Sequence, residues 1–184
     1  MEGSGDSGKR LAYGSFFAGK KGYIAPRFFF VFVDAFHPEA DMETRWESGV
    51  LGEWEWKLWQ LLTDEGAGLG THEYRKRLGV SAKSGQSSLD TAVTNLQMTF
   101  DVSFAGNTAM LDKNGLPYNK AVLVDLTQRW APAEWRALAP RRSHEEALET
   151  ICRQALLMSS GGARADVEKV FAKGLKQYKR FAAL

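Results

Sequence analysis

Residues 87–105 read SSLDTAVTNLQMTFDVSFA, and within this stretch the spacing of the apolar residues changes from helical to extended. The apolar residues of the first part recur at intervals of three and four, which is the spacing of one buried helix face. They are Leu89, Ala92, Val93, Leu96 and Phe100. From Phe100 onward every second residue is large and apolar, as in a half-buried strand. Ser87 and Asp90 have the spacing of a capping box, so we expect the helix to begin there.

Two more helices are predicted before this stretch. Residues 53–65 place their apolar side chains on one helical face, and the glycines that follow end that helix. A short helix is expected over residues 71–78, with Thr71 as its N-cap and Gly79 at its end. Together with residues 87–105, these patterns predict three successive helices followed by a strand.

A second strand is predicted after the first. The loop expected over residues 106–120 contains Asn114-Gly115, a pair typical of a hairpin turn, and the apolar segment 121–126 follows it. Helix, short helix, helix, strand, loop and strand is the order of a winged helix-turn-helix. The predicted fold class is therefore mainly α with a small β-hairpin (α+β), a winged helix-turn-helix flanked by additional helices.

Four parts are expected along the chain. Residues 1–10 contain mainly glycine, serine and charged residues and predict a flexible tail. Residues 11–50 predict an N-terminal helical segment, in which Pro26 suits the first turn of a buried aromatic helix. Residues 51–127 are the expected winged-helix domain. Residues 128–184 predict a C-terminal helical segment that packs on the winged helix.

Composition excludes several classes of protein. The chain has 184 residues, of which 44% are hydrophobic and 25% charged, the balance of an ordinary globular protein with its own core. No signal peptide and no long apolar run occurs, and the single cysteine, Cys152, cannot form an internal disulfide. We therefore expect no membrane span and a cytoplasmic location.

The sequence lacks the motifs of catalysis and metal binding. His37, His72 and His144 lie far apart, and none has a second ligand at the spacing of a metal site. Cys152 falls on an apolar helix face, where a thiol behaves as a small apolar group. No phosphate loop, dinucleotide fingerprint or Gly-x-Ser-x-Gly motif occurs. We expect no metal and no cofactor, and we assign no catalytic residue.

The formal net charge of +2 conceals an uneven distribution. Residues 34–65 contain nine acidic residues and two basic ones, whereas residues 71–89 contain four basic residues and one acidic, and residues 163–184 six basic and two acidic. Because the acidic block repels phosphate, any contact with nucleic acid must come from the basic segments. The alternatives are that the charged runs are solvated faces, or that the last segment is a basic helix on a membrane or an acidic partner.

A winged helix would place its third helix in the major groove of duplex DNA and its wing against the adjacent groove or backbone. The start and outer face of the third helix carry Lys83, Ser84, Gln86, Ser88, Thr91 and Asn95. The wing carries Lys113, Asn114 and Lys120, and the second helix carries Arg75, Lys76 and Arg77. These are the predicted DNA-binding residues. Because the third helix has no basic residue after its first turn, binding is expected to be weak or led by shape.

The same stretch resembles a known family. Residues 89–97 (LDTAVTNLQ), followed by Phe100-Asp101-Val102, look like the Leu-Gln junction between helix and strand in AlkZ-related proteins, relatives of the AlkZ-type winged-helix DNA glycosylases. Other segments also resemble that family, namely Ala12-Tyr13-Gly14, Phe17-Ala18-Gly19-Lys20 and residues 121–130. The likeness extends over about residues 11–163, and it implies tandem winged-helix ancestry and association with DNA.

The chain departs from the glycosylases at their catalytic motif. Those enzymes position the attacking water with Gln-x-Gln or Gln-x-Asp, and no glutamine of this sequence has such a partner. The resemblance is thus to a shortened or divergent member, and catalysis is not carried over. Three functions stay open: a non-catalytic DNA-binding or DNA-repair protein, a module that binds a protein partner or forms a homodimer, and a divergent DNA glycosylase.

Overall fold

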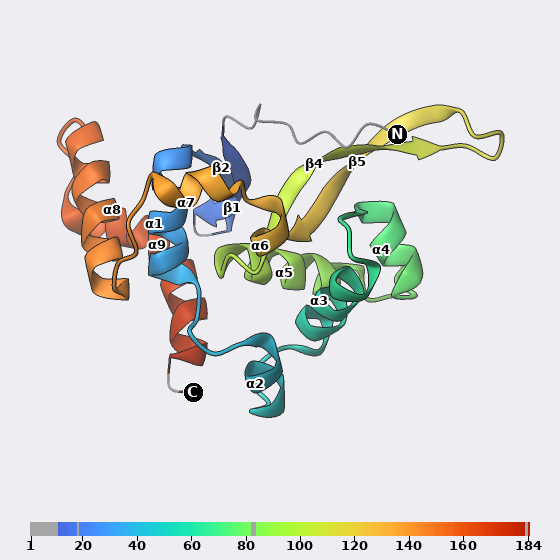
Figure 1. Cartoon of the computed structure of the whole chain (residues 1–184), viewed down its shortest axis with the longest axis horizontal. Coiled ribbons are helices and arrows are strands. Elements are labelled where there is room, and N and C mark those ends of the chain that lie inside the picture. Colours follow the sequence, from blue (N-terminus) through green and yellow to red (C-terminus); the bar gives the residue numbers. More distant parts are fainter. Residues whose placement is uncertain (1–10, 18, 82–83, 183) are drawn as a thin grey trace.

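The computed structural model describes residues 11–17, 19–81, 84–182 and 184, and these residues form an α+β fold (Figure 1). In the described part of the chain, helices predominate, and the strands form one two-stranded and one three-stranded antiparallel sheet. The predicted α+β class is confirmed. The predicted tail, residues 1–10, lies outside the described residues.

The centre of the fold contains three helices and three strands. They are α3 (Glu53–Glu65), β3 (Leu69–Gly70), α4 (Thr71–Arg77), α5 (Gln86–Met98), β4 (Val102–Leu111) and β5 (Pro117–Leu126). β5 lies between β3 and β4 and is antiparallel to both. The predicted N-cap of α4, Thr71, is instead its first helical residue. Gly70 is the N-cap, and its N–H donates to the Glu73 carboxylate at 2.7 Å.

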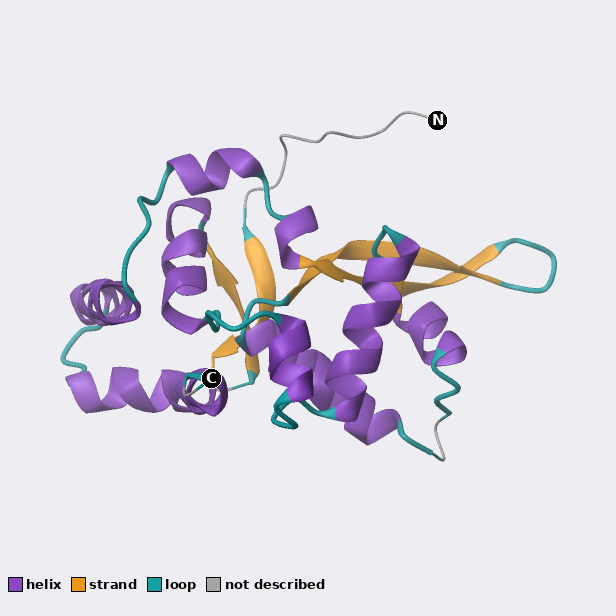
Figure 2. Ribbon diagram, turned by 60° about the horizontal axis from the view of Figure 1, so that its bottom comes forward, coloured by secondary structure: helices purple, strands orange, loops and turns teal. Residues whose placement is uncertain are grey.

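β4 and β5 form a long arm that projects from the body of the molecule (Figures 1 and 2). They pair from Val102 opposite Leu126 to Leu111 opposite Pro117, so most of the loop expected over residues 106–120 is strand. That expectation was wrong because the outer half of the arm is largely exposed on both faces and lacks the alternation of a half-buried strand.

α5 begins earlier and by a different cap than predicted. Its first residue is Gln86, and the N-cap is Gly85 in the left-handed conformation with φ of 79°, so the predicted capping box of Ser87 and Asp90 is wrong. A Cβ atom at this position would approach the Trp54 ring to 3.3 Å. Both the backbone angle and the close ring therefore favour glycine before α5.

The remaining elements come from the two ends of the chain. They are β1 (Ala12–Phe17), β2 (Lys20–Ile24), α1 (Pro26–Phe36), α2 (Met42–Glu47), α6 (Thr127–Trp130), α7 (Ala133–Ala137), α8 (His144–Met158) and α9 (Arg164–Phe181). β1 and β2 form a hairpin in residues 11–50, which were expected to be helical. The prediction missed this hairpin because β1 is buried on both faces and its side chains do not alternate. Pro26 begins α1 as expected.

Two hydrophobic cores meet at the turn between α5 and β4. The first core joins the terminal segments and includes Phe100, which stacks on Phe16 with ring centroids 4.9 Å apart. The second lies beneath α3, α5 and the arm and includes Leu58 and Leu62. α9 contributes to both, since Val167 and Phe171 pack in the first core and Phe181 packs in the second. This position brings the C-terminal helix against α5.

A buried ion pair fixes α2 beside the same turn. Arg45 is 1% exposed and donates to both carboxylate oxygens of Asp101, at 2.9 and 2.7 Å. The Thr99 hydroxyl donates to this carboxylate at 2.5 Å, and the Arg45 guanidinium lies over the Phe181 ring, 5.0 Å from its centroid. The only basic side chain of α2 is therefore used inside the protein.

Candidate nucleic-acid interface

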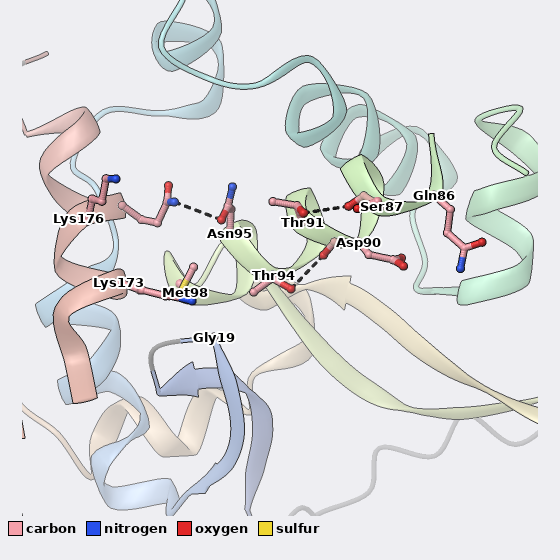
Figure 3. Close-up of a pocket in the computed structure, with 11 residues that line it drawn as sticks. Gly19, Gln86, Ser87, Asp90, Thr91, Thr94, Asn95, Met98, Lys173 and Lys176 are labelled. Atoms are coloured by element: carbon pink, nitrogen blue, oxygen red, sulfur yellow. Dashed lines mark hydrogen bonds between the residues drawn. The ribbon is translucent and has the colours of Figure 1, made fainter. Parts of the chain in front are cut away.

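α5 has one exposed end and one covered end. Ser87, Ser88 and Thr91 in its first half are exposed, whereas residues 96–98 are buried. An open groove of about 850 Å³ follows the outer face of the helix (Figure 3). Its lining comes from α5, α9 and the turn between β1 and β2: Gly19, Gln86, Ser87, Asp90, Thr91, Thr94, Asn95, Met98, Lys173, Lys176 and Gln177.

Asn95 is half-buried and lines the groove, and its side chain contacts two other helices. Its Nδ2 donates to Glu55 Oε1 at 2.7 Å, and its Oδ1 accepts from Gln177 Nε2 at 3.1 Å, the contact drawn in Figure 3. Arg180 extends the network by donating to Gln177 Oε1 at 2.6 Å and to Glu55 Oε1 at 3.3 Å. Because α3 and α9 each bond one of its two amide atoms, Asn95 joins three helices.

α9 brings two lysines to the groove that were not among the predicted site residues. Lys173 and Lys176 are exposed, and neither forms an ion pair with a residue that the structure describes. The sequence showed the basic segment 163–184 but not that α9 meets the end of α5. That contact joins Asn95 to Gln177, positions 82 residues apart, and no local pattern predicts such a pairing.

The basic residues of α4 are partly paired already. Arg75 donates to Asp90 at 2.6 Å, and Arg77 forms an ion pair with Glu65, whereas Lys76 is exposed and has no ion-pair partner in the described part of the chain. The contact between Arg75 and Asp90 has two consequences. It neutralises the acidic residue of α5, and it occupies one of the arginines that were expected to contact the DNA backbone.

The wing residues lie apart from the groove. Lys113 and Asn114 occupy the exposed turn between β4 and β5, where the Asn114 N–H donates to Asp112 Oδ1 at 2.8 Å, and Lys120 is exposed on β5. The turn that Asn114-Gly115 predicted is confirmed. Ser84 is exposed just before α5, and Lys83 lies outside the described residues.

The described residues contain no group of three or more His, Cys, Asp or Glu side chains that could hold a metal ion. Burial raises the pKa of the Cys152 thiol, which favours the unreactive protonated form. Gln97 is fully buried, and its Oε1 accepts from the Ser15 N–H at 3.0 Å. Within the same residues, no helix is long and apolar enough to cross a membrane.

The fold and the groove define the class as an α+β protein in which a polar groove, bordered at one end by lysines, runs along the outer face of a helix. A family model described as AlkZ related matches residues 5–172. The chain therefore belongs to the AlkZ-related family, as residues 89–102 had indicated. No curated protein and no solved structure gives a significant match.

Proposed function

We propose that this chain is a non-catalytic member of the AlkZ-related family that binds duplex DNA, with residues 51–127 acting as a winged helix. The element order from α3 to β5, with β5 between the other two strands, supports this assignment. α5 is then the helix that enters the major groove, and the arm is the wing. Membership in the family supports a role linked to DNA repair.

The observation that carries the proposal is the groove along the outer face of α5. Recognition helices contact base edges with the residues of their N-terminal end, and Gln86 and Ser88 occupy that end here. Lys173 and Lys176 border the same groove and have no ion-pair partner among the described residues, so their charge is available for phosphates. The groove thus runs from Gln86 and Ser87 at the start of α5 to the two lysines of α9 at its other end.

The charges available in the groove set the expected strength of binding. Asp90 is neutralised by Arg75, so the groove presents mainly the charges of its two lysines. Each neutralised phosphate contributes a slope of about −0.9 to a plot of log K against log salt concentration. With so few free cations, binding to unrelated sequences should be weak, and the salt slope should be shallow, about −2 for the two lysines.

The state of Gln97 supports a non-catalytic role. Among the six glutamines, it is the one at the helix-to-strand junction that resembles the family, yet its side chain is fully buried and holds the backbone of β1. A glutamine that positions a hydrolytic water must reach solvent or substrate. A divergent glycosylase would need another residue for that task, and release of alkylated bases from damaged duplex DNA is the assay that tests for it.

The proposal is tested by fluorescence anisotropy with labelled duplex DNA over a salt series. We expect the double variant Lys173→Ala/Lys176→Ala to bind more weakly and to reduce the magnitude of the salt slope by about 2, one for each lost phosphate contact.

The matched control is Lys169→Ala/Lys179→Ala, which makes the same charge change on the same helix outside the groove. Equal losses in both double variants would show that net charge alone attracts DNA and would contradict the groove. Absence of binding by the parent protein at low salt would overturn the proposal as a whole.

A further inference from the structure

Three tryptophans form a continuous stack on α2 and α3. The Trp46 and Trp56 rings are 5.5 Å apart between centroids and 4° from parallel, and the Trp56 and Trp59 rings are 5.3 Å apart and 20° from parallel. Trp46 is 38% exposed, and the other two are partly buried. In Figure 1, α2 lies at the bottom of the molecule, whereas the arm extends to the upper right. The stack therefore ends on an exposed indole face remote from the wing.

Every charge that α2 presents to solvent is negative. Glu43 and Glu47 are exposed beside Trp46 in the sequence, and neither forms an ion pair with a described residue. The N-cap Asp41 accepts hydrogen bonds from the backbone N–H and side chain of Thr44, which lower its pKa and keep it ionised. The one basic residue, Arg45, is buried against Asp101. The exposed indole of Trp46 therefore shares its helix with exposed carboxylates and with no exposed cation.

In the neighbouring helix α3, an indole ring and a carboxylate share one cation. Lys57 lies 5.1 Å from the centroid of the Trp54 ring and pairs with Glu53 at 2.5 Å. One cation there contacts both an indole face and a carboxylate. The surface formed by Trp46, Glu43 and Glu47 has the indole and the carboxylates but no cation of its own.

We propose that the stacked tryptophans and the carboxylates of α2 bind an arginine-rich segment of a protein partner. A guanidinium group stacks on an indole face and also pairs with carboxylates in a bidentate manner, which an ammonium group does less well. Phosphate-bearing ligands are disfavoured because this surface is acidic. The surface shares no residue with the groove over α5, so one chain can contact DNA and a basic protein segment at the same time.

The test uses a synthetic peptide in which arginine alternates with glycine, and it records tryptophan fluorescence and isothermal titration calorimetry with the full chain. We expect saturable binding that weakens with added salt and about tenfold weaker binding by Trp46→Leu, the loss of one cation–π contact with its neighbouring ion pairs. A lysine peptide of the same length is expected to bind more weakly than the arginine peptide.

Glu43→Gln/Glu47→Gln should weaken peptide binding, and Glu134→Gln/Glu145→Gln is its control, since it removes two exposed carboxylates elsewhere. All of these variants should keep the DNA affinity of the parent, so failure here is distinguishable from failure of the proposed function. Peptide binding that is absent, or unchanged in Trp46→Leu, overturns the proposal. A dimeric mass in light scattering that Trp46→Leu converts to a monomer also overturns it, because the occupant is then a second copy.

Discussion

The two ends of α5 differ in the contacts that their polar side chains make with the rest of the chain. Near the C-terminal end, Asn95 gives both amide atoms to partners on α3 and α9. Near the N-terminal end, Ser88 is exposed next to Ser87, which lines the open groove. The helical spacing of the sequence places both residues on the same polar face of α5. Tertiary contacts, and not residue type, decide that one end supports the fold and the other is available for a ligand.

The largest expected effect is a loss of stability on breaking the buried ion pair between Arg45 and Asp101, which lies just beyond the covered end of α5. Arg45→Ala should reduce the free energy of unfolding by about 3–5 kcal/mol, because Asp101 keeps a buried charge without its main partner. Urea denaturation followed by circular dichroism measures the loss. Arg164→Ala is the control, since it breaks only exposed ion pairs and should leave the unfolding midpoint nearly unchanged. Similar midpoints for both variants would contradict the buried pair.

A smaller loss of stability is expected from the covered end itself. Asn95→Ala should cost about 1–3 kcal/mol, because Glu55 and Gln177 each lose a hydrogen-bond partner in a half-buried place. Below the unfolding temperature, the affinity of this variant for duplex DNA should equal that of the parent. A stable Asn95→Ala protein with weakened DNA binding would reverse the roles assigned to the two ends.

The opposite pattern is expected at the exposed end. Ser88→Glu adds a carboxylate to the first turn of α5, where the helix dipole favours negative charge, so stability should change by less than about 0.5 kcal/mol. The same carboxylate would face DNA phosphates, and we expect affinity to fall about tenfold, the effect of roughly 1.4 kcal/mol. Thermal unfolding and anisotropy on the same sample measure both quantities. Unchanged affinity would place the DNA contact elsewhere.

Local patterns predicted the parts of the molecule in which one face is buried. The change of spacing at Phe100 marked the end of α5 and the strand that follows, and Pro26 marked the start of α1. Local patterns failed where burial was uniform, as in β1, or absent, as in the outer arm. They also could not place Lys173 in the groove, because that position depends on how α9 packs against α5.

The smallest expected effect is a pH-dependent change in stability that involves α4. This helix contains Arg75, which pairs with Asp90 near the exposed end of α5. Burial raises the pKa of Tyr74 above its ordinary value of 10.0. The unfolded chain then loses this proton at a lower pH than the folded chain, so stability is retained below about pH 10 and decreases as the pH rises further. Tyr74→Phe should flatten that decrease in urea unfolding midpoints, whereas Tyr23→Phe, at a residue that is 65% exposed, should not. If both variants follow the parent curve, Tyr74 does not anchor α4 as its burial indicates, and the start of α5 is supported by its other contacts.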